Sequence, residues 1–152
     1  MSLYFNKKVK GYLLINVIVV LGIIALLSTI SIPFIKKYQP NLKLSGTARD
    51  LVADLRLAQQ LTVTEQVAHA VIFNLLNDSY QILKLDVATT TIKSVNFNAE
   101  VSYQQVTGLT NNQVVFNYYG GVSEAGQVIL ININANTAAI NIKPSGYIQL
   151  VD

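Results

Sequence analysis

Residues 11–35 of this chain read GYLLINVIVVLGIIALLSTISIPFI, and this stretch decides the fold. It contains no charged residue, and a helix of that length spans roughly 37 Å, enough to cross a hydrocarbon core of about 30 Å. A secretory signal has a shorter apolar region and then small residues at a cleavage site, a pattern that the segment STISIPF does not match. The sequence therefore predicts a retained membrane helix, with the polar residue Asn16 near its start and Pro33 near its end.

The formal net charge of +3 belongs to the residues before this helix. Lys7, Lys8 and Lys10 precede Gly11, and the other eight basic residues are matched by eight acidic ones. Net charge therefore gives no support to binding of nucleic acid. Basic residues flank both ends of the apolar run in nearly equal numbers, so the positive-inside rule does not decide the orientation of the helix. The short N-terminal side favours a cytoplasmic N-terminus and export of the larger domain.

A second helical pattern follows Pro40. Apolar residues recur there at spacings of three and four, which predicts one buried stripe on an amphipathic helix. The stripe consists of Leu44, Ala48, Leu51, Val52, Leu55, Ala58 and Thr62. Together with the apolar run it predicts one long helix from about Tyr12 to Thr64, whose first half lies in lipid and whose second half packs on a globular domain.

From Gln66 the period of the pattern changes to two. Seven or eight short apolar segments alternate with turn residues, among them Asp78, Asn111–Asn112, Gly120–Gly121 and Ala135–Asn136. Strands that follow a single helix predict an α+β fold with antiparallel sheet. We therefore expect a long N-terminal helix, transmembrane in its first half, and then an antiparallel β-sheet domain.

The sequence KGYLLINVIVVLGIIALL resembles the N-terminus of type IV pilins and type II secretion pseudopilins, with a basic leader, a glycine, an aromatic residue and an apolar helix. The resemblance implies a leader over residues 1–11, a membrane and filament-core helix over 12–35, its amphipathic continuation over 36–64 and a β-rich domain over 65–152. It also implies that a prepilin peptidase cuts between Gly11 and Tyr12 and methylates the new amine. Pro33 falls where many members carry a helix proline.

One position departs from the pattern of that family. The fifth residue after the cut is usually a glutamate, which is thought to pair with the free amine of a neighbouring subunit, and here it is Asn16. An asparagine accepts a hydrogen bond from an amine but cannot neutralise it. Two interpretations remain open: an ordinary interhelical hydrogen bond, or a subunit that needs no partner above it, as at a filament tip.

The resemblance extends over nearly the whole chain. The segment ARDLVADLRLAQQLTVTEQVAHAVIFN is similar to the helix-to-strand region of the H-type minor pseudopilins, and the C-terminal order of strand, glycine turn, hairpin and Gly-aromatic strand is similar to their closing pattern. The resemblance implies a pilin-like fold. It also implies other pilin or pseudopilin subunits, prepilin peptidase and the inner membrane as partners.

The sequence predicts no catalytic residue, no cofactor and no metal site. Without cysteine, the chain has neither a disulfide framework nor a thiolate nucleophile. His69 is the only histidine, and its place in VAHAVIF indicates a half-buried structural residue. Asp50 and Asp54 share a helix face, where we expect a solvated surface near Arg49 and Arg56 and not a cation site.

These observations lead to two hypotheses. The first is a structural subunit of a type II secretion pseudopilus or a type IV pilus, with a role in initiation or at the tip. The alternative is a minor pilin that binds DNA or another substrate, in natural transformation or adhesion. Few basic residues follow Arg56, and the C-terminal YIQLVD has none, which argues against DNA because phosphates must be neutralised.

Overall fold

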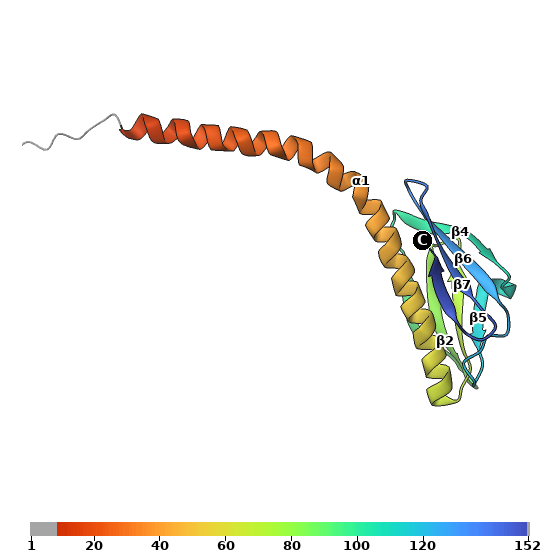
Figure 1. The fold of residues 1–152 in the computed structure, drawn as a ribbon. Helices are drawn as coiled ribbons and strands as arrows, with labels where there is room; N and C mark the ends of the chain where they lie inside the picture. The colour runs from red at the N-terminus through yellow and green to blue at the C-terminus, as the bar shows by residue number, and fades with distance from the viewer. Residues whose placement is uncertain (1–8, 152) are drawn as a thin grey trace, which may run out of the picture. The chain divides into compact units, whose positions relative to one another are not determined.

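The computed structural model describes residues 9–151, with side chains from Tyr12 to Val151 (Figure 1). The helix α1 (Val9–Glu65) comes first, and eight strands and a short 3-10 helix, η1 (Thr110–Asn112), follow it. The chain divides into two compact units, one up to Gln39 and one from Pro40 onward, so the second half of α1 belongs to the same unit as the strands. The predicted α+β order of one long helix and then antiparallel strands is confirmed.

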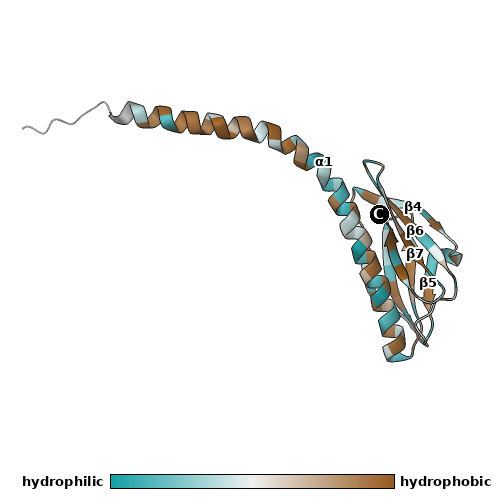
Figure 2. Ribbon diagram, in the orientation of Figure 1, coloured by the Kyte–Doolittle hydropathy of each residue, from teal (hydrophilic) through white to brown (hydrophobic). Residues whose placement is uncertain are grey.

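The two parts of α1 differ in how hydrophobic residues are distributed around the helix. From Tyr12 to Ile35 apolar residues occupy nearly all sides of the helix, whereas from Pro40 they alternate with polar ones (Figure 2). All seven residues of the predicted stripe, from Leu44 to Thr62, are buried and at most 7% exposed. The helix ends where Gln66 adopts a left-handed conformation (φ 56°) and its side-chain amide donates to the carbonyl oxygen of Val63 at 2.7 Å.

The strands form two antiparallel sheets of four strands each. The first sheet has the order β3-β2-β1-β5. Its strands are β1 (His69–Asn74), β2 (Ser79–Leu85), β3 (Thr89–Asn96) and β5 (Gln113–Phe116). The second sheet has the order β4-β6-β7-β8. Its strands are β4 (Val101–Thr107), β6 (Gly126–Asn132), β7 (Thr137–Ile142) and β8 (Ile148–Val151). Sequence periodicity predicted the strands but not their division, because it carries no information on which strands pair.

The turns lie where the sequence placed them, and several carry a residue with positive φ. Asp78 (φ 44°) turns β1 into β2, and Ala135 (φ 61°) turns β6 into β7. Gly146 (φ 78°) has a further reason to be glycine, since a Cβ there would lie 1.9 Å from the carbonyl oxygen of Gly120. The side-chain amide of Gln59 donates to the carbonyl oxygens of Gly120 and Gly146, at 2.5 and 3.1 Å, and so fastens both turns to α1.

The hydrophobic core of the globular unit is built from three sources. The buried stripe of α1 contributes one wall, and inward residues of both sheets contribute the rest, such as Ile82 from the first sheet and Leu130 and Ile140 from the second. Within the described chain, every buried apolar residue of this core lies at or beyond Leu44. The globular unit thus has its own core, to which residues 12–39 contribute nothing.

This core predicts a difference between two leucines of the same helix. Leu55 is fully buried, so Leu55→Ala should lower the free energy of unfolding by about 2–5 kcal/mol. Leu57 is 38% exposed, so Leu57→Ala should cost less than about 1 kcal/mol. Denaturant unfolding of the full chain in detergent micelles, followed by tyrosine fluorescence, measures both. Equal losses would mean that this face of α1 does not pack on the sheets.

Candidate functional site

The first candidate site is the apolar part of α1, which we call the apolar segment and define as residues 12–38. Each of its large apolar side chains is at least 51% exposed. Among the described residues, this is the one helix long and apolar enough to cross a membrane. A helix that is apolar on all sides is stable only against lipid or other apolar helices, because water does not solvate such a surface.

The serine and threonine side chains of this segment are satisfied within the helix itself. Ser28 and Ser31 donate their hydroxyl groups to the carbonyl oxygens of Ile24 and Leu27, at 2.8 and 3.0 Å. Thr29 bonds in the same way to the preceding turn. Such bonds hide hydroxyl groups from an apolar environment, so they are compatible with a helix in lipid.

Asn16 differs from these serine and threonine residues. Its side chain is exposed, and within the described residues its amide makes no hydrogen bond. It lies in a shallow depression of about 240 Å³ with Leu13, Val17, Val20 and Leu21. An amide surrounded by apolar side chains has two donor hydrogens and an acceptor oxygen available for another chain.

The other predicted site residues also lie on α1. Gly11 falls within the helix, and Tyr12 directly after it is 72% exposed. The helix continues through Pro33 without a break in its assignment. Residues 1–8 of the predicted leader lie outside the described residues. None of these placements tests the predicted processing or assembly roles, which therefore remain predictions.

In the globular unit the structure corrects the expectation for Asp54. Its exposure is only 5%, so it does not lie on a solvated face as we expected for the Asp50–Asp54 pair. The hydroxyl of Tyr80 donates to Asp54 Oδ2 at 2.6 Å, and Lys93 Nζ lies 2.8 Å from the same carboxylate. Asp54 is three residues after Leu51 and four before Ala58, so its position in the buried stripe was visible in the sequence. Asp50 is exposed, as expected.

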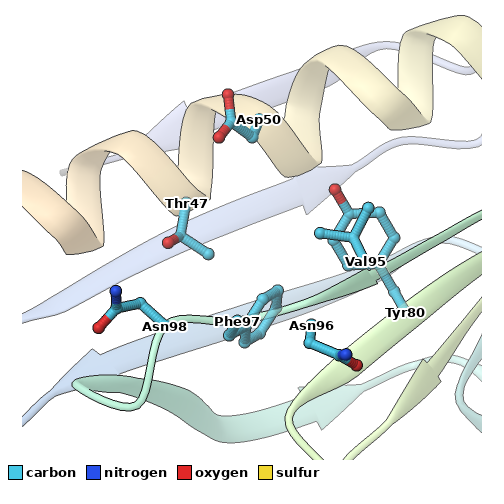
Figure 3. A pocket seen from close by; sticks show the side chains of 7 residues that line it. All are labelled: Thr47, Asp50, Tyr80, Val95, Asn96, Phe97 and Asn98. Atoms are coloured by element: carbon cyan, nitrogen blue, oxygen red, sulfur yellow. The ribbon is translucent and has the colours of Figure 1, made fainter.

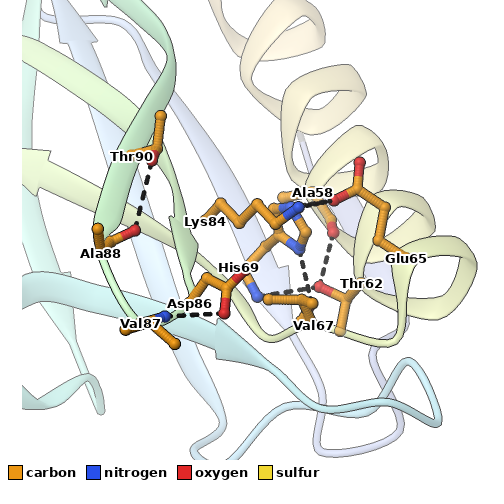
Figure 4. A network of polar contacts seen from close by, with 10 residues as sticks. All are labelled: Ala58, Thr62, Glu65, Val67, His69, Lys84, Asp86, Val87, Ala88 and Thr90. Carbon is orange, nitrogen blue, oxygen red and sulfur yellow. Dashed lines mark hydrogen bonds and ion pairs between the residues drawn. The ribbon is translucent and has the colours of Figure 1, made fainter.

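His69 is more deeply buried than the half-buried position we expected, with no exposed surface. Its Nδ1 lies 2.8 Å from the carbonyl oxygen of Val67, and its backbone N–H donates to the Thr62 hydroxyl at 3.1 Å (Figure 4). Its Nε2 lies 3.7 Å from Glu65 Oε2 and has no hydrogen-bond partner. The backbone of His69 therefore joins the start of β1 to α1, and its ring bonds to the segment between them.

Three ion pairs fasten α1 to the β-rich part of the unit. Lys43 pairs with Glu100 at 2.8 Å, Asp54 with Lys93 at 2.8 Å, and Glu65 with Lys84 at 2.7 Å. The hydrogen bond from Lys84 is the main reason that the pKa of Glu65 lies below its ordinary value, and the same contact raises the pKa of Lys84. Burial, together with the hydrogen bond to Asp54, raises the pKa of Tyr80 far above its ordinary value. These side chains serve to hold the fold.

The described residues, 9–151, hold no cluster of three or more histidine, aspartate or glutamate side chains that could bind a metal ion. The polar networks described above join α1 to the strands, and each charged member faces a partner of opposite charge. The arrangement thus accounts for the buried Asp54, Thr62 and His69 as structural residues. The apolar segment is the feature that the fold itself leaves unexplained.

The fold of this chain is that of minor pseudopilins and minor type IV pilins. The minor pseudopilin EpsH from the type 2 secretion system of Vibrio cholerae superposes with a TM-score of 0.63, over 72% of this chain and 96% of EpsH, at 10% sequence identity. The type IV minor pilin FimU of Pseudomonas aeruginosa superposes with a TM-score of 0.61, over 79% of this chain and 93% of FimU, at 15% identity.

Comparison of sequences alone gives no match, either with protein-family models or with curated proteins. The pilin-like, minor-pseudopilin fold indicated by the sequence pattern is therefore confirmed at the level of structure. At this low identity the likeness concerns the fold alone.

The buried contact between Tyr80 and Asp54 generates a testable expectation. Tyr80→Phe removes the hydroxyl and leaves the buried carboxylate with Lys93 alone, so it should lower the free energy of unfolding by roughly 1–3 kcal/mol. Tyr147→Phe is the matched control, because Tyr147 is 55% exposed. Denaturant unfolding of both variants measures the difference. A Tyr80→Phe variant as stable as the control would contradict the importance of this contact.

The Glu65–Lys84 pair predicts a dependence of stability on pH. Because the folded-state pKa of Glu65 is lowered, the pair stabilises the fold above the ordinary carboxyl pKa. That contribution is lost as pH falls through the lowered pKa. The stability difference between the wild type and Glu65→Gln should therefore be present at neutral pH and vanish in acid. Unfolding curves recorded as a function of pH, with Lys84→Met as the reference background, measure it. A difference that persists unchanged in Lys84→Met would refute the assignment to this pair.

Proposed function

We propose that this protein is a minor pseudopilin or minor pilin, a structural subunit of a type II secretion pseudopilus or a type IV pilus. The observation that carries the proposal is an apolar segment with no partner in the described chain, joined to a globular unit with the minor-pseudopilin fold. Before assembly, residues 12–35 anchor the subunit in the inner membrane. After assembly, the same residues pack against the helices of other subunits. Both environments remove the exposed apolar side chains from water.

The proposed orientation places the N-terminus in the cytoplasm and the globular unit outside the inner membrane. The short basic leader supports it, since a few residues with three lysines are retained more readily than a domain of over a hundred residues. The prepilin peptidase then meets the Gly11–Tyr12 bond at the cytoplasmic end of the apolar segment. It cleaves there and methylates Tyr12.

Asn16 and Pro33 are the assembly residues of this proposal. Asn16 offers its free amide to the amine of a neighbouring subunit, and it does so without placing a charge in lipid. It does not neutralise that amine, which suits a subunit at the tip or at the start of a filament. Pro33 interrupts the helical hydrogen bonds near one end of the apolar segment, where it is tolerated.

The proposal assigns the protein no catalytic activity. Binding of DNA, the alternative hypothesis, receives little support from the globular unit. Lys43, Lys84 and Lys93 are engaged by carboxylates, and the ammonium group of Lys143 lies 5.3 Å from the ring centre of Tyr147. Phosphate binding would have to compete with these contacts.

The experiment that tests the proposal is N-terminal mass spectrometry after co-expression with a prepilin peptidase. We expect a mature chain that begins at Tyr12, whose apolar segment stays attached and keeps the protein in the membrane fraction. A chain with an intact start, or one cut beyond Ile32 and released in soluble form, would overturn the proposal.

Two glycine variants sharpen this experiment. Gly11→Val places a branched side chain beside the bond to be cut, so it should block processing. Gly22→Val is the matched control, because nothing lies within 4 Å of a Cβ at that position. It should insert and be processed like the wild type. Processing that is lost equally in both variants would point to a failure of membrane insertion.

A further inference from the structure

A pocket of about 410 Å³ lies in the globular unit, between α1 and the end of β3. Thr47 and Asp50 of α1, Tyr80 of β2 and residues 95–98 line it. Thr47 points from the helix toward residues 95–98, and the Asp50 carboxylate lies further from them, at the upper edge of the helix in this view (Figure 3).

The pocket has an excess of negative charge. Asp50 makes no hydrogen bond or ion pair within the described part of the chain, although its charge acts on Tyr80. Asp54, one helical turn further, is already satisfied by Tyr80 and Lys93. The lining residues include no lysine, arginine or histidine. The Asp50 carboxylate is thus left without a positive partner, and a cation would supply one.

One aromatic ring in the lining is accessible, that of half-buried Phe97, and the buried Tyr80 and the neighbouring Tyr103 support it from behind. The rings of Tyr80 and Phe97 are 5.9 Å apart, and that of Tyr103 lies 4.7 Å from Phe97. The Tyr103 hydroxyl donates to the backbone of Ser79 at 3.2 Å, and the Tyr80 hydroxyl donates to Asp54, so two of the three rings are held in place. Aromatic faces attract cations, and planar ones in particular can stack on them.

The remaining lining residues supply oxygen atoms. The Thr47 hydroxyl and the side-chain amides of Asn96 and Asn98 can accept hydrogen bonds around the opening. The pocket is also accessible, because β3 is the edge strand of its sheet and seven of its eight residues are exposed. A side chain carried by another protein can therefore approach along this edge.

We propose that this pocket binds an arginine side chain presented by a partner protein. The guanidinium group is planar and weakly hydrated and carries five N–H donors. It matches a lining of one unpaired carboxylate, several neutral oxygens and the half-buried ring of Phe97. A lysine ammonium would satisfy the charge but not the stacking surface. A metal ion would find only one free carboxylate. This inference goes beyond the proposed subunit role and does not depend on it, since it concerns the globular unit alone.

The test uses the full chain, isotopically labelled, in uncharged maltoside micelles. N-acetyl-arginine amide is titrated against it and followed by NMR, with N-acetyl-citrulline amide as a neutral probe of nearly the same shape. We expect shifts confined to the pocket, including the side-chain amides of Asn96 and Asn98. The dissociation constant should be on the order of millimolar, as suits a small ligand at an open site. The citrulline derivative should cause no such shifts, and N-acetyl-lysine amide should bind more weakly than the arginine derivative.

Two matched variants complete the test. Asp50→Asn should weaken binding of the arginine derivative by roughly threefold to fivefold, the value of one solvent-accessible ion pair. Asp86→Asn should leave it unchanged, because Asp86 is an exposed carboxylate beyond the opposite end of β2 from Tyr80. Both replaced residues are exposed, so core resonances should confirm that the fold is kept.

Several results would overturn this inference. They are equal binding of the citrulline or lysine derivative, shifts centred outside the pocket, and unchanged affinity in Asp50→Asn. The test is independent of processing. If the chain is cut after Gly11 but does not bind the arginine derivative, the proposed function is kept and the pocket inference is rejected. If the chain binds the arginine derivative but is not cut, the pocket inference is kept and the proposed function is rejected.

Discussion

The constraint on which the rest of this molecule depends is the need to keep the apolar segment out of water. Burying one Val, Leu, Ile or Phe side chain contributes about 1.5–3 kcal/mol, and the segment exposes more than a dozen of them. The sum is of order tens of kcal/mol, larger than the 5–15 kcal/mol that typically separates a folded domain from its unfolded chain. The environment of this segment therefore decides where the protein resides before any contact of the globular unit does.

One helix meets two different requirements along its length. Up to Ile35 it is apolar on nearly every side and bonds its serine and threonine hydroxyl groups to its own backbone, and up to Gln39 it contributes nothing to the described core. From Pro40 it presents one buried stripe to the sheets and directs charged side chains at the strands around it. Three ion pairs and the double hydrogen bond of Gln59 then hold it to its sheets. The stability of the globular unit thus rests on packing to which residues 12–39 contribute nothing.

The sequence was informative where local periodicity determines the structure. The stripe from Leu44 to Thr62 and the turns at Asp78 and Ala135 follow from spacing and from residue type, and the structure confirms them. The division into two sheets could not be predicted, because the pairing of strands depends on contacts between residues far apart in the chain. The burial of Asp54 was missed for a different reason. A charged side chain on a helix favours a solvated position, and the hydroxyl and the ammonium group that make burial of this carboxylate tolerable come from the distant strands β2 and β3.

The same reasoning bears on Asn16. A glutamate in lipid is costly unless it is paired with a cation, so a subunit that carries one gains strongly from a neighbour that supplies an amine. An asparagine removes both the cost and most of that gain, because a hydrogen bond within a membrane contributes only about 0.6–2 kcal/mol. Under the proposed function, the amide of Asn16 therefore creates a weaker energetic demand for a partner than a carboxylate would. In the assembly proposed above, a subunit with an amide at this position has less need of a partner in the membrane, which suits the proposed minor component better than one that polymerises in bulk.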